Sequence, residues 1–215
     1  MRSWWQKRYT VPSGPTLCVL CVDVEHCLRL RVQHPAEMAV ALETFQRLVR
    51  TLIRKHTLYE ATSSGDSFLC VSQRARNAVA FALELHCQLQ TVGWRENRLR
   101  ARVGVHYGNA SATHNPETKR FEFRGPAPDV AVRLRNQSGG GQVLVTGAVL
   151  DEVATQPGCG GIMGVVSNHG LMRIDDTGTP MRLYQRTRVS PIGGHACGPD
   201  AACAGTPAQS NIRPR

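Results

Sequence analysis

Two aspartates stand where an apolar stretch of the sequence gives way to a polar turn. Asp23 follows the run TLCVLCV, and Asp66 follows Gly65 between the short extended runs LYEATS and SFLCVS. If the strands that carry them are neighbours, both carboxylates meet at one edge of a sheet, where paired acidic oxygens bind Mg²⁺ or Mn²⁺. Two such ions can activate an attacking hydroxyl and neutralise a leaving pyrophosphate. The simpler interpretation is a strand-end aspartate and a turn aspartate without metal, and spacing alone favours it.

The eight cysteines raise the alternatives of a disulfide framework or a zinc site. Several of them lie inside apolar runs, which favours buried free thiols. Cys18 and Cys21 form a CxxC motif, but residues three apart on a strand face opposite ways, which does not suit a single metal ion. A zinc site that uses Cys18, Cys21, His26 or Cys27 is therefore disfavoured.

The net charge of +10 is almost entirely arginine, because the only lysines are Lys7, Lys55 and Lys119. A basic chain can bind nucleic acid, anionic lipid or a phosphorylated ligand. The arginines are spread along the chain, and no predicted strand carries the aromatic and basic pattern of RNA recognition, so we expect no nucleic-acid partner.

Membrane insertion and secretion are not indicated either. No stretch approaches the roughly 20 consecutive apolar residues that cross a bilayer. The N-terminal MRSWWQKRYT lacks the apolar core and cleavage site of a secretory signal. We therefore expect a cytoplasmic location, with no membrane contact from this chain itself.

The first half of the chain predicts alternating strands and helices around the two aspartates. A strand is expected over 16–24, a hairpin around Gly65 and Asp66, a helix over 75–92, and a strand from Leu99 to Val105 whose basic face we expect to be solvated. A long amphipathic helix begins at Pro35, because apolar residues recur at intervals of three and four: Met38, Leu42, Phe45, Leu48, Val49, Leu52 and Ile53.

The second half predicts a loop over 114–121, a short extended run FEF, and a helix from about Pro126 to Gly139. The strand QVLVT, the helix AVLDEVA and a closing hairpin of LMRIDD with MRLYQRT follow. This order predicts an α+β fold, a ferredoxin-like sandwich with a mostly antiparallel central sheet, packed helices and a C-terminal hairpin. We expect an N-terminal extension over 1–14, one domain over 15–188 and a disordered tail over 189–215.

Five segments of the chain, in order, resemble the class III adenylate and guanylate cyclase catalytic domain. They are CVDVE, GDSF about forty residues later, RVGVHYG, FEFRGPAPDVAVR and GGGQVLVT. The polar stretch before FEF and the closing GLMRIDDTGTPMRLYQ are similar to the receptor-type adenylate cyclases of protozoa. The resemblance covers roughly residues 15 to 187, and five motifs in the right order are more specific than any one of them.

The resemblance implies a head-to-tail dimer, with itself or with another cyclase domain, that converts ATP to cyclic AMP and pyrophosphate at the subunit interface. One subunit supplies Asp23, Asp66 and the backbone carbonyl of Val24 to two Mg²⁺ or Mn²⁺ ions. The other subunit supplies Arg133, which matches the arginine that stabilises the pentavalent phosphorus, while Gly125 matches the glycine before that helix.

The positions that contact base and ribose depart from the family pattern. Glu122 stands where adenylate cyclases have an aspartate that accepts a hydrogen bond from the adenine amino group. Thr62 stands at the purine-contacting lysine, and Asp129 replaces the asparagine that orients the ribose. The remaining substrate positions are Gly65 and a phosphate-cradling turn in which small residues are usual and this chain has His26, Cys27 and Leu28.

The sequence leaves two functions open. Retention of Asp23, Asp66 and Arg133 favours an adenylate cyclase, with ATP preferred to GTP. The departures favour a catalytically degenerate cyclase-homology module that binds nucleotide or regulates an active cyclase partner. If the chain is a fragment, it is the cytoplasmic part of a membrane receptor.

Overall fold

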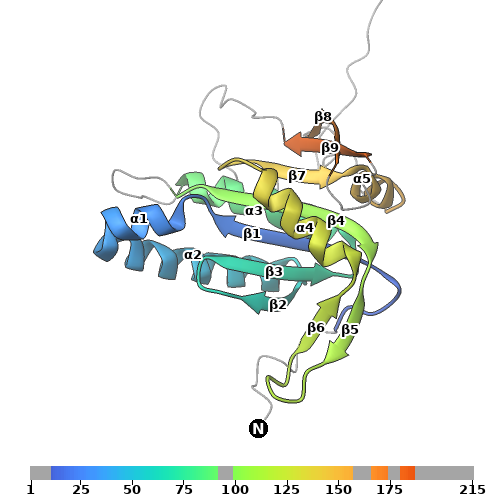
Figure 1. The fold of residues 1–215 in the computed structure, drawn as a ribbon, viewed down its shortest axis with the longest axis horizontal. Coiled ribbons are helices and arrows are strands. Elements are labelled where there is room, and N and C mark those ends of the chain that lie inside the picture. The colour runs from blue at the N-terminus through green and yellow to red at the C-terminus, as the bar shows by residue number, and fades with distance from the viewer. Residues whose placement is uncertain (1–10, 92–98, 157–165, 174–179, 187–215) are drawn as a thin grey trace, which may run out of the picture.

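The computed structural model describes residues 11–91, 99–156, 166–173 and 180–186. Figure 1 shows the elements, which are, in chain order, β1 (Thr16–Val24), α1 (Cys27–Gln33), α2 (Pro35–Lys55), β2 (Tyr59–Ser63), β3 (Ser67–Ser72), α3 (Ala75–Thr91), β4 (Ala101–Asn109), β5 (Ser111–His114), β6 (Phe121–Arg124), α4 (Pro126–Gln137), β7 (Val143–Thr146), α5 (Gly147–Ala154), β8 (Val166–Arg173) and β9 (Pro180–Arg186). The expected disordered tail and most of the expected N-terminal extension lie outside the described residues.

A seven-stranded sheet runs through the centre of the molecule in the order β2-β3-β1-β4-β7-β9-β8. Its neighbouring strands pair antiparallel except β4 and β7, which pair parallel. β5 and β6 form a separate two-stranded arm that projects from one end of the sheet (Figure 1). The predicted α+β fold, the mostly antiparallel sheet and the closing hairpin β8–β9 are confirmed.

Helices cover the two faces of the sheet unequally. The larger core contains buried side chains of α2, α3 and α5, whereas α4 lies alone on the opposite face (Figure 1). Because successive strand residues alternate between faces, β1 contributes Cys18 to the larger core and Cys21 to the α4 face. Both are buried free thiols, and burial raises the pKa of Cys21 to about 11. The predicted opposite orientation of this CxxC pair is confirmed.

The helices predicted from apolar periodicity are present, with Pro35 in the first turn of α2 as expected. Helix α1 was not predicted, because only Cys27 of its seven residues is buried and only Leu30 packs partly against the larger core, which is too short an apolar stripe to recognise. Two of its apolar side chains are exposed to solvent, Leu28 at 78% and Val32 at 75%. Over the described ranges, none of the helices combines the length and apolar character needed to cross a bilayer.

The polar segment 114–121 was predicted as a loop, but its first and last residues belong to strands, so the prediction is wrong for these two residues. His114 is the last residue of β5 and Phe121 is the first residue of β6, and the two pair across the arm. All four residues of β5 are exposed, so no alternation of apolar and polar residues marks this strand. The amide of Phe121 donates to the hydroxyl of Tyr59 at 3.0 Å, which joins the arm to β2.

Helix α4 lies unusually close to β4 at Gly104. A Cβ added to Gly104 would lie 2.4 Å from both the Ala131 carbonyl oxygen and the Arg135 amide nitrogen. Such contacts are too short for real atoms, so only glycine permits this approach. The lack of a side chain at Gly104 therefore allows α4 to pack close to the sheet and determines the distance of Arg135 from it.

Candidate active site

The structure brings the backbones of the two aspartates together. Asp23 lies opposite Ser67 in the antiparallel pairing of β1 with β3, and the Val24 amide donates to the Asp66 carbonyl oxygen at 3.1 Å. Asp66 follows the tip of the β2–β3 hairpin, where Gly65 has the positive φ of 79° that favours glycine. The condition set by the sequence, that the strand of Asp23 and the hairpin of Asp66 are neighbours, is met by the pairing of β1 with β3.

The thiol of Cys27 connects the two carboxylates electrostatically. Burial is the main cause that raises the pKa of Cys27 to about 11, followed by a hydrogen bond with Asp66. The negative charge of Asp23 also raises this pKa. Because both carboxylates act on one small side chain at the start of α1, they share one corner of the molecule.

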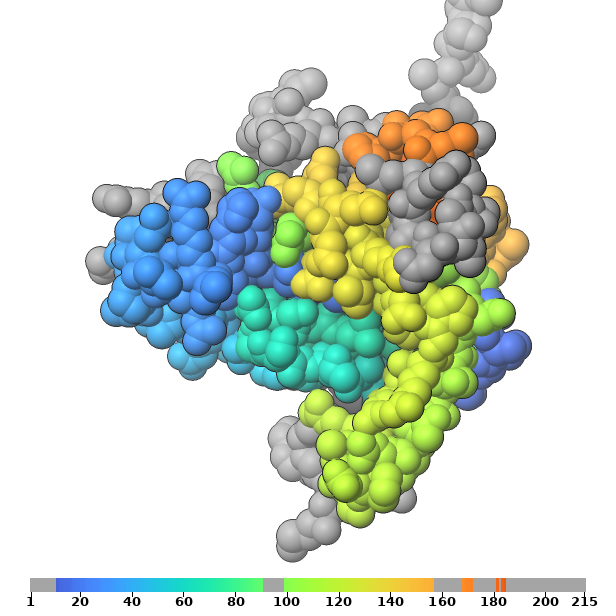
Figure 2. Space-filling model, viewed as in Figure 1, coloured from blue at the N-terminus to red at the C-terminus, as the bar shows by residue number. Residues whose placement is uncertain are grey.

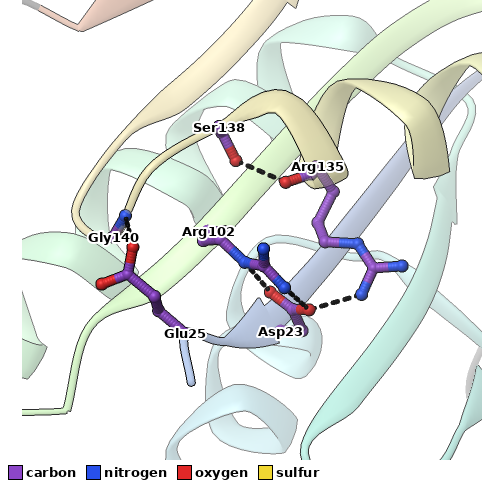
Figure 3. Close-up of polar contacts among 6 residues, drawn as sticks. All are labelled: Asp23, Glu25, Arg102, Arg135, Ser138 and Gly140. Atoms are coloured by element: carbon purple, nitrogen blue, oxygen red, sulfur yellow. Dashed lines mark hydrogen bonds and ion pairs between the residues drawn. The ribbon is translucent and has the colours of Figure 1, made fainter. Parts of the chain in front are cut away.

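Asp23 is held by two arginines (Figure 3). Arg102 lies directly opposite it on β4 and donates from Nε to Oδ1 at 2.8 Å and from Nη2 to Oδ2 at 2.5 Å. Arg135, from the last turn of α4, donates from Nη1 to the same Oδ2 at 2.5 Å. Only 5% of Asp23 is exposed, so this carboxylate is an internal anion with two cationic partners.

Arg102 does not belong to a solvated basic face, so that prediction is wrong for this residue. Its hydrogen bonds to Asp23 are the main cause that raises the pKa of its guanidinium group. Its neighbour Arg100 is exposed, as expected. The alternation along the strand was predicted correctly, but the partner of Arg102 depends on the register between β1 and β4.

Arg135 was missed in the sequence because a charged residue in the last turn of a helix is normally solvated. The available signal was its position four residues after Ala131, which is fully buried against the sheet. Residues four apart share a helix face, whereas residues two apart point in nearly opposite directions. Arg135 therefore points toward β1, where it contacts Asp23, and Arg133 lies on a different face of α4.

A second set of contacts ties the end of α4 to the end of β1 (Figure 3). The Gly140 amide donates to Glu25 Oε1 at 2.6 Å, and the hydroxyl of Ser138 donates to the carbonyl oxygen of Arg135 at 2.8 Å. Sequence reasoning gave no role to Glu25. Its contact fixes the loop after α4 beside Asp23.

The residues predicted to contact base and ribose lie elsewhere on the chain. Thr62 is exposed on β2 beside an irregularity in its pairing with β3, and Asp129 is exposed in the first turn of α4. Glu122 lies on β6 in the arm, which projects from the end of the sheet opposite to α1 (Figure 1). The structure therefore does not gather these three residues around Asp23.

Glu122 is already engaged within the arm. It accepts hydrogen bonds from Asn115 Nδ2 at 2.5 Å and from Arg124 Nη2 at 3.1 Å. These two contacts, Asn115 first, lower the pKa of its carboxyl group. Glu122 is therefore a charged acceptor in a fixed position, as recognition of a base edge requires.

The predicted phosphate-cradling turn is the start of α1. His26 is exposed and takes the left-handed conformation at φ 54°, which is uncommon for a residue other than glycine. Cys27 is buried beside Asp66, and the Leu28 side chain points into solvent. The turn is therefore tight without glycine, and its side chains are large.

The donor chemistry of this corner suits a hard divalent cation. Asp23, Asp66 and the Val24 carbonyl are oxygen donors on adjacent backbone segments, which is the ligand type that Mg²⁺ and Mn²⁺ take. Among the described residues no three His, Cys, Asp or Glu side chains converge as a complete metal cage. Two carboxylates suit ions that keep water and phosphate ligands, and the two guanidinium groups on Asp23 oppose such ions.

The chain belongs to the family of the Adenylate and Guanylate cyclase catalytic domain, whose sequence profile matches residues 10–159. The receptor-type adenylate cyclase of Trypanosoma congolense is 30% identical over an alignment of 179 residues, and the match covers 66% of this chain and 24% of that protein. The receptor-type adenylate cyclase GRESAG 4.3 of Trypanosoma brucei brucei is 28% identical over an alignment of 174 residues, and the match covers 64% of this chain and 14% of that protein. The chain thus spans a quarter or less of the length of these relatives.

Solved structures share the fold. An adenylate cyclase from Trypanosoma brucei in its monomeric state superimposes with a TM-score of 0.74 at 26% identity, over 83% of this chain and 92% of that one. The guanylate cyclase domain of RhGC from Catenaria anguillulae, solved in complex with GTP, superimposes with a TM-score of 0.69 at 17% identity. The match covers 80% of this chain and 96% of that one. The second likeness shows the fold alone.

Proposed function

We propose that this chain is an adenylate cyclase catalytic domain that converts ATP to cyclic AMP and pyrophosphate at the interface of two cyclase domains. The observation that carries the proposal is the register that joins the end of β1 to the β2–β3 hairpin, with Asp23 opposite Ser67 and Val24 bonded to Asp66. The relatives named as adenylate cyclases support the reaction class.

In this reaction the ribose 3′-oxygen forms a bond to the α-phosphorus and loses its proton. The bond from the α-phosphorus to the bridging oxygen breaks, and pyrophosphate leaves. Two Mg²⁺ or Mn²⁺ ions would supply charge neutralisation and activation of the hydroxyl. Asp23, Asp66 and the Val24 carbonyl would hold these ions, and Arg133 would stabilise the charge on the pentavalent phosphorus.

A dimer is supported by the distribution of site residues on the single chain. The metal-binding residues lie beside α1, whereas Glu122 lies on the arm at the other end of the sheet (Figure 1). Figure 2 shows α4 open on one face of the molecule beside the β2–β3 hairpin, where a second domain has access to it. Arg133 is two residues before Arg135 on α4 and so lies on a different face of the helix, which suits a residue that serves the site of a second subunit. The partner is a second copy of this chain or another cyclase domain.

Glu122 would accept a hydrogen bond from the adenine amino group, which favours ATP over GTP. Thr62 would contact the ring and Asp129 the ribose, while Gly65 and the turn of His26, Cys27 and Leu28 would lie against the phosphates. The receptor-type relatives support a place in the cytoplasmic part of a membrane receptor.

The second candidate is a cyclase-homology module that regulates an active partner without catalysis of its own. The observation that favours it is the engagement of both Asp23 oxygens by Arg102 and Arg135, which leaves this carboxylate satisfied without metal. In that case the metal-binding half of the site would not be used.

The test is a product assay with the purified chain, MnATP and MnGTP in parallel. We expect cyclic AMP from ATP, and its loss in Asp66→Ala but not in Glu43→Ala, which removes an exposed carboxylate on α2. Activity that appears only on mixing with a second cyclase domain identifies a heterodimer. No cyclic nucleotide under either condition contradicts the enzymatic proposal and favours the regulatory module.

A further inference from the structure

The Asp23 carboxylate has more cationic partners than it needs for internal pairing. Arg102 alone forms the two-pronged contact, with one donor on each oxygen. Arg135 adds a third hydrogen bond and a second positive charge to Oδ2. The pair of guanidinium groups therefore leaves Asp23 overcompensated by one charge.

Arg135 is not well satisfied in this position. Its Nε is buried and has no hydrogen-bond acceptor within the described part of the chain. Its side chain is only 16% exposed, so water compensates little for the missing partner. A buried donor without an acceptor is unfavourable, and the attraction to Asp23 offsets this penalty.

Positive charge already lies against the predicted metal ligand. Arg102 and Arg135 both donate to Asp23, and the carboxylate of Glu25 acts on Arg102 as well. A divalent ion that enters this corner alone therefore meets a ligand atom, Asp23 Oδ2, that already accepts hydrogen bonds from two guanidinium groups. Repulsion between like charges a few ångströms apart and partly buried is strong.

We propose that Arg135 is an internal counter-cation that a divalent ion must displace from Asp23 Oδ2. It follows that Arg135 weakens the binding of metal to the chain alone, and that metal enters together with the negative charge of a triphosphate. This inference rests on the metal site of the proposed function. It assigns to Arg135 control over metal affinity, a role separate from the one proposed for Arg133.

The test measures Mn²⁺ binding to the purified full chain without nucleotide, from the electron paramagnetic resonance signal of free Mn²⁺. Arg135→Gln removes the charge, and we expect its Mn²⁺ affinity to be at least about tenfold higher than that of the wild type. Arg135→Met fills the same half-buried space without charge. This variant replaces Arg135→Gln in the test if circular dichroism shows that the glutamine variant does not fold.

Two controls separate the local effect from a change in net charge. Arg124→Gln removes the arginine that pairs with Glu122 on the arm, far from Asp23. The Mn²⁺ affinity of this variant should equal that of the wild type. The double variant Asp23→Asn with Arg135→Gln should lose the gain, because the released ligand is then absent.

The outcomes distinguish this inference from the proposed function. Equal or weaker Mn²⁺ binding in folded Arg135→Gln and Arg135→Met overturns the role of Arg135 while the metal site stands. A gain that persists in the double variant also overturns it. No Mn²⁺ binding in any folded variant also overturns the role of Arg135, and the cyclic AMP assay with MnATP then decides the proposed function separately.

Discussion

Asp23 and Arg102 face each other across β1 and β4, and the arginine donates to both carboxylate oxygens, at 2.8 and 2.5 Å. The pair stands at the end of the central strand, beside the hairpin that carries Asp66. The same register that pairs Asp23 with an arginine also brings it to the second aspartate. The ion pair of Asp23 and the candidate metal site therefore both depend on the register of β1 with its neighbouring strands.

The first prediction concerns the stability that this pair supplies. Arg102→Ala leaves a buried carboxylate with Arg135 as its remaining cationic partner, and we expect the free energy of unfolding to fall by roughly 2 kcal/mol. Arg100→Ala, an exposed neighbour, should change it by less than about 0.5 kcal/mol. Urea unfolding of both variants measures the difference. Equal effects would show that Asp23 does not depend on Arg102.

The second prediction concerns the close approach of α4 to β4. Gly104→Ala places a methyl group 2.4 Å from the Ala131 carbonyl oxygen and the Arg135 amide nitrogen, so the helix must shift. We expect a loss of about 3 kcal/mol in unfolding free energy, although alanine normally stabilises a strand relative to glycine. In Gly139→Ala the nearest atom belongs to the flexible Gln142 side chain at 3.3 Å, and the loss should be small. A neutral Gly104→Ala would mean that α4 is not seated as described.

The third prediction concerns pH. His106 on β4 hydrogen-bonds Thr146 through Nδ1 at 2.9 Å, and burial lowers its pKa to about 4. Between about pH 6.5 and pH 4 the unfolded chain protonates this histidine while the folded chain keeps it neutral, so stability falls as the pH is lowered through that window. We expect His106 to account for about 2 kcal/mol of the loss between pH 7 and pH 5.

His106→Gln removes this titration, and its unfolding free energy should fall less steeply over that interval in urea titrations at both pH values. A slope equal to that of the wild type would show that His106 is not held neutral by burial.

Much of the fold follows from patterns along the chain. The apolar spacing from Met38 to Ile53 predicted α2, and the Gly65–Asp66 turn between two extended runs predicted the β2–β3 hairpin. Both depend on local chemistry. Helix α1 and strand β5 were not predicted because their exposed residues carry no periodic apolar signal.

The candidate site was only partly predictable. Asp23 is identifiable because it ends an apolar run, and Asp66 because it stands in a Gly-Asp turn between two extended runs. The arginines are not, since the partner of Arg102 depends on the β1–β4 register and that of Arg135 on the height of α4 above Gly104. Both relationships join residues far apart in the sequence, which a single sequence does not reveal.

The central claim is that one catalytic site combines Asp66 of one subunit with Arg133 of another. The most direct measurement is cyclic AMP formation from MnATP by an equimolar mixture of Asp66→Ala and Arg133→Ala chains, each inactive alone. In a mixed homodimer one site keeps both residues, so we predict recovery of about a quarter of the wild-type activity after subunit exchange. A mixture that stays inactive, while the wild-type chain is active under the same conditions, would contradict the shared site.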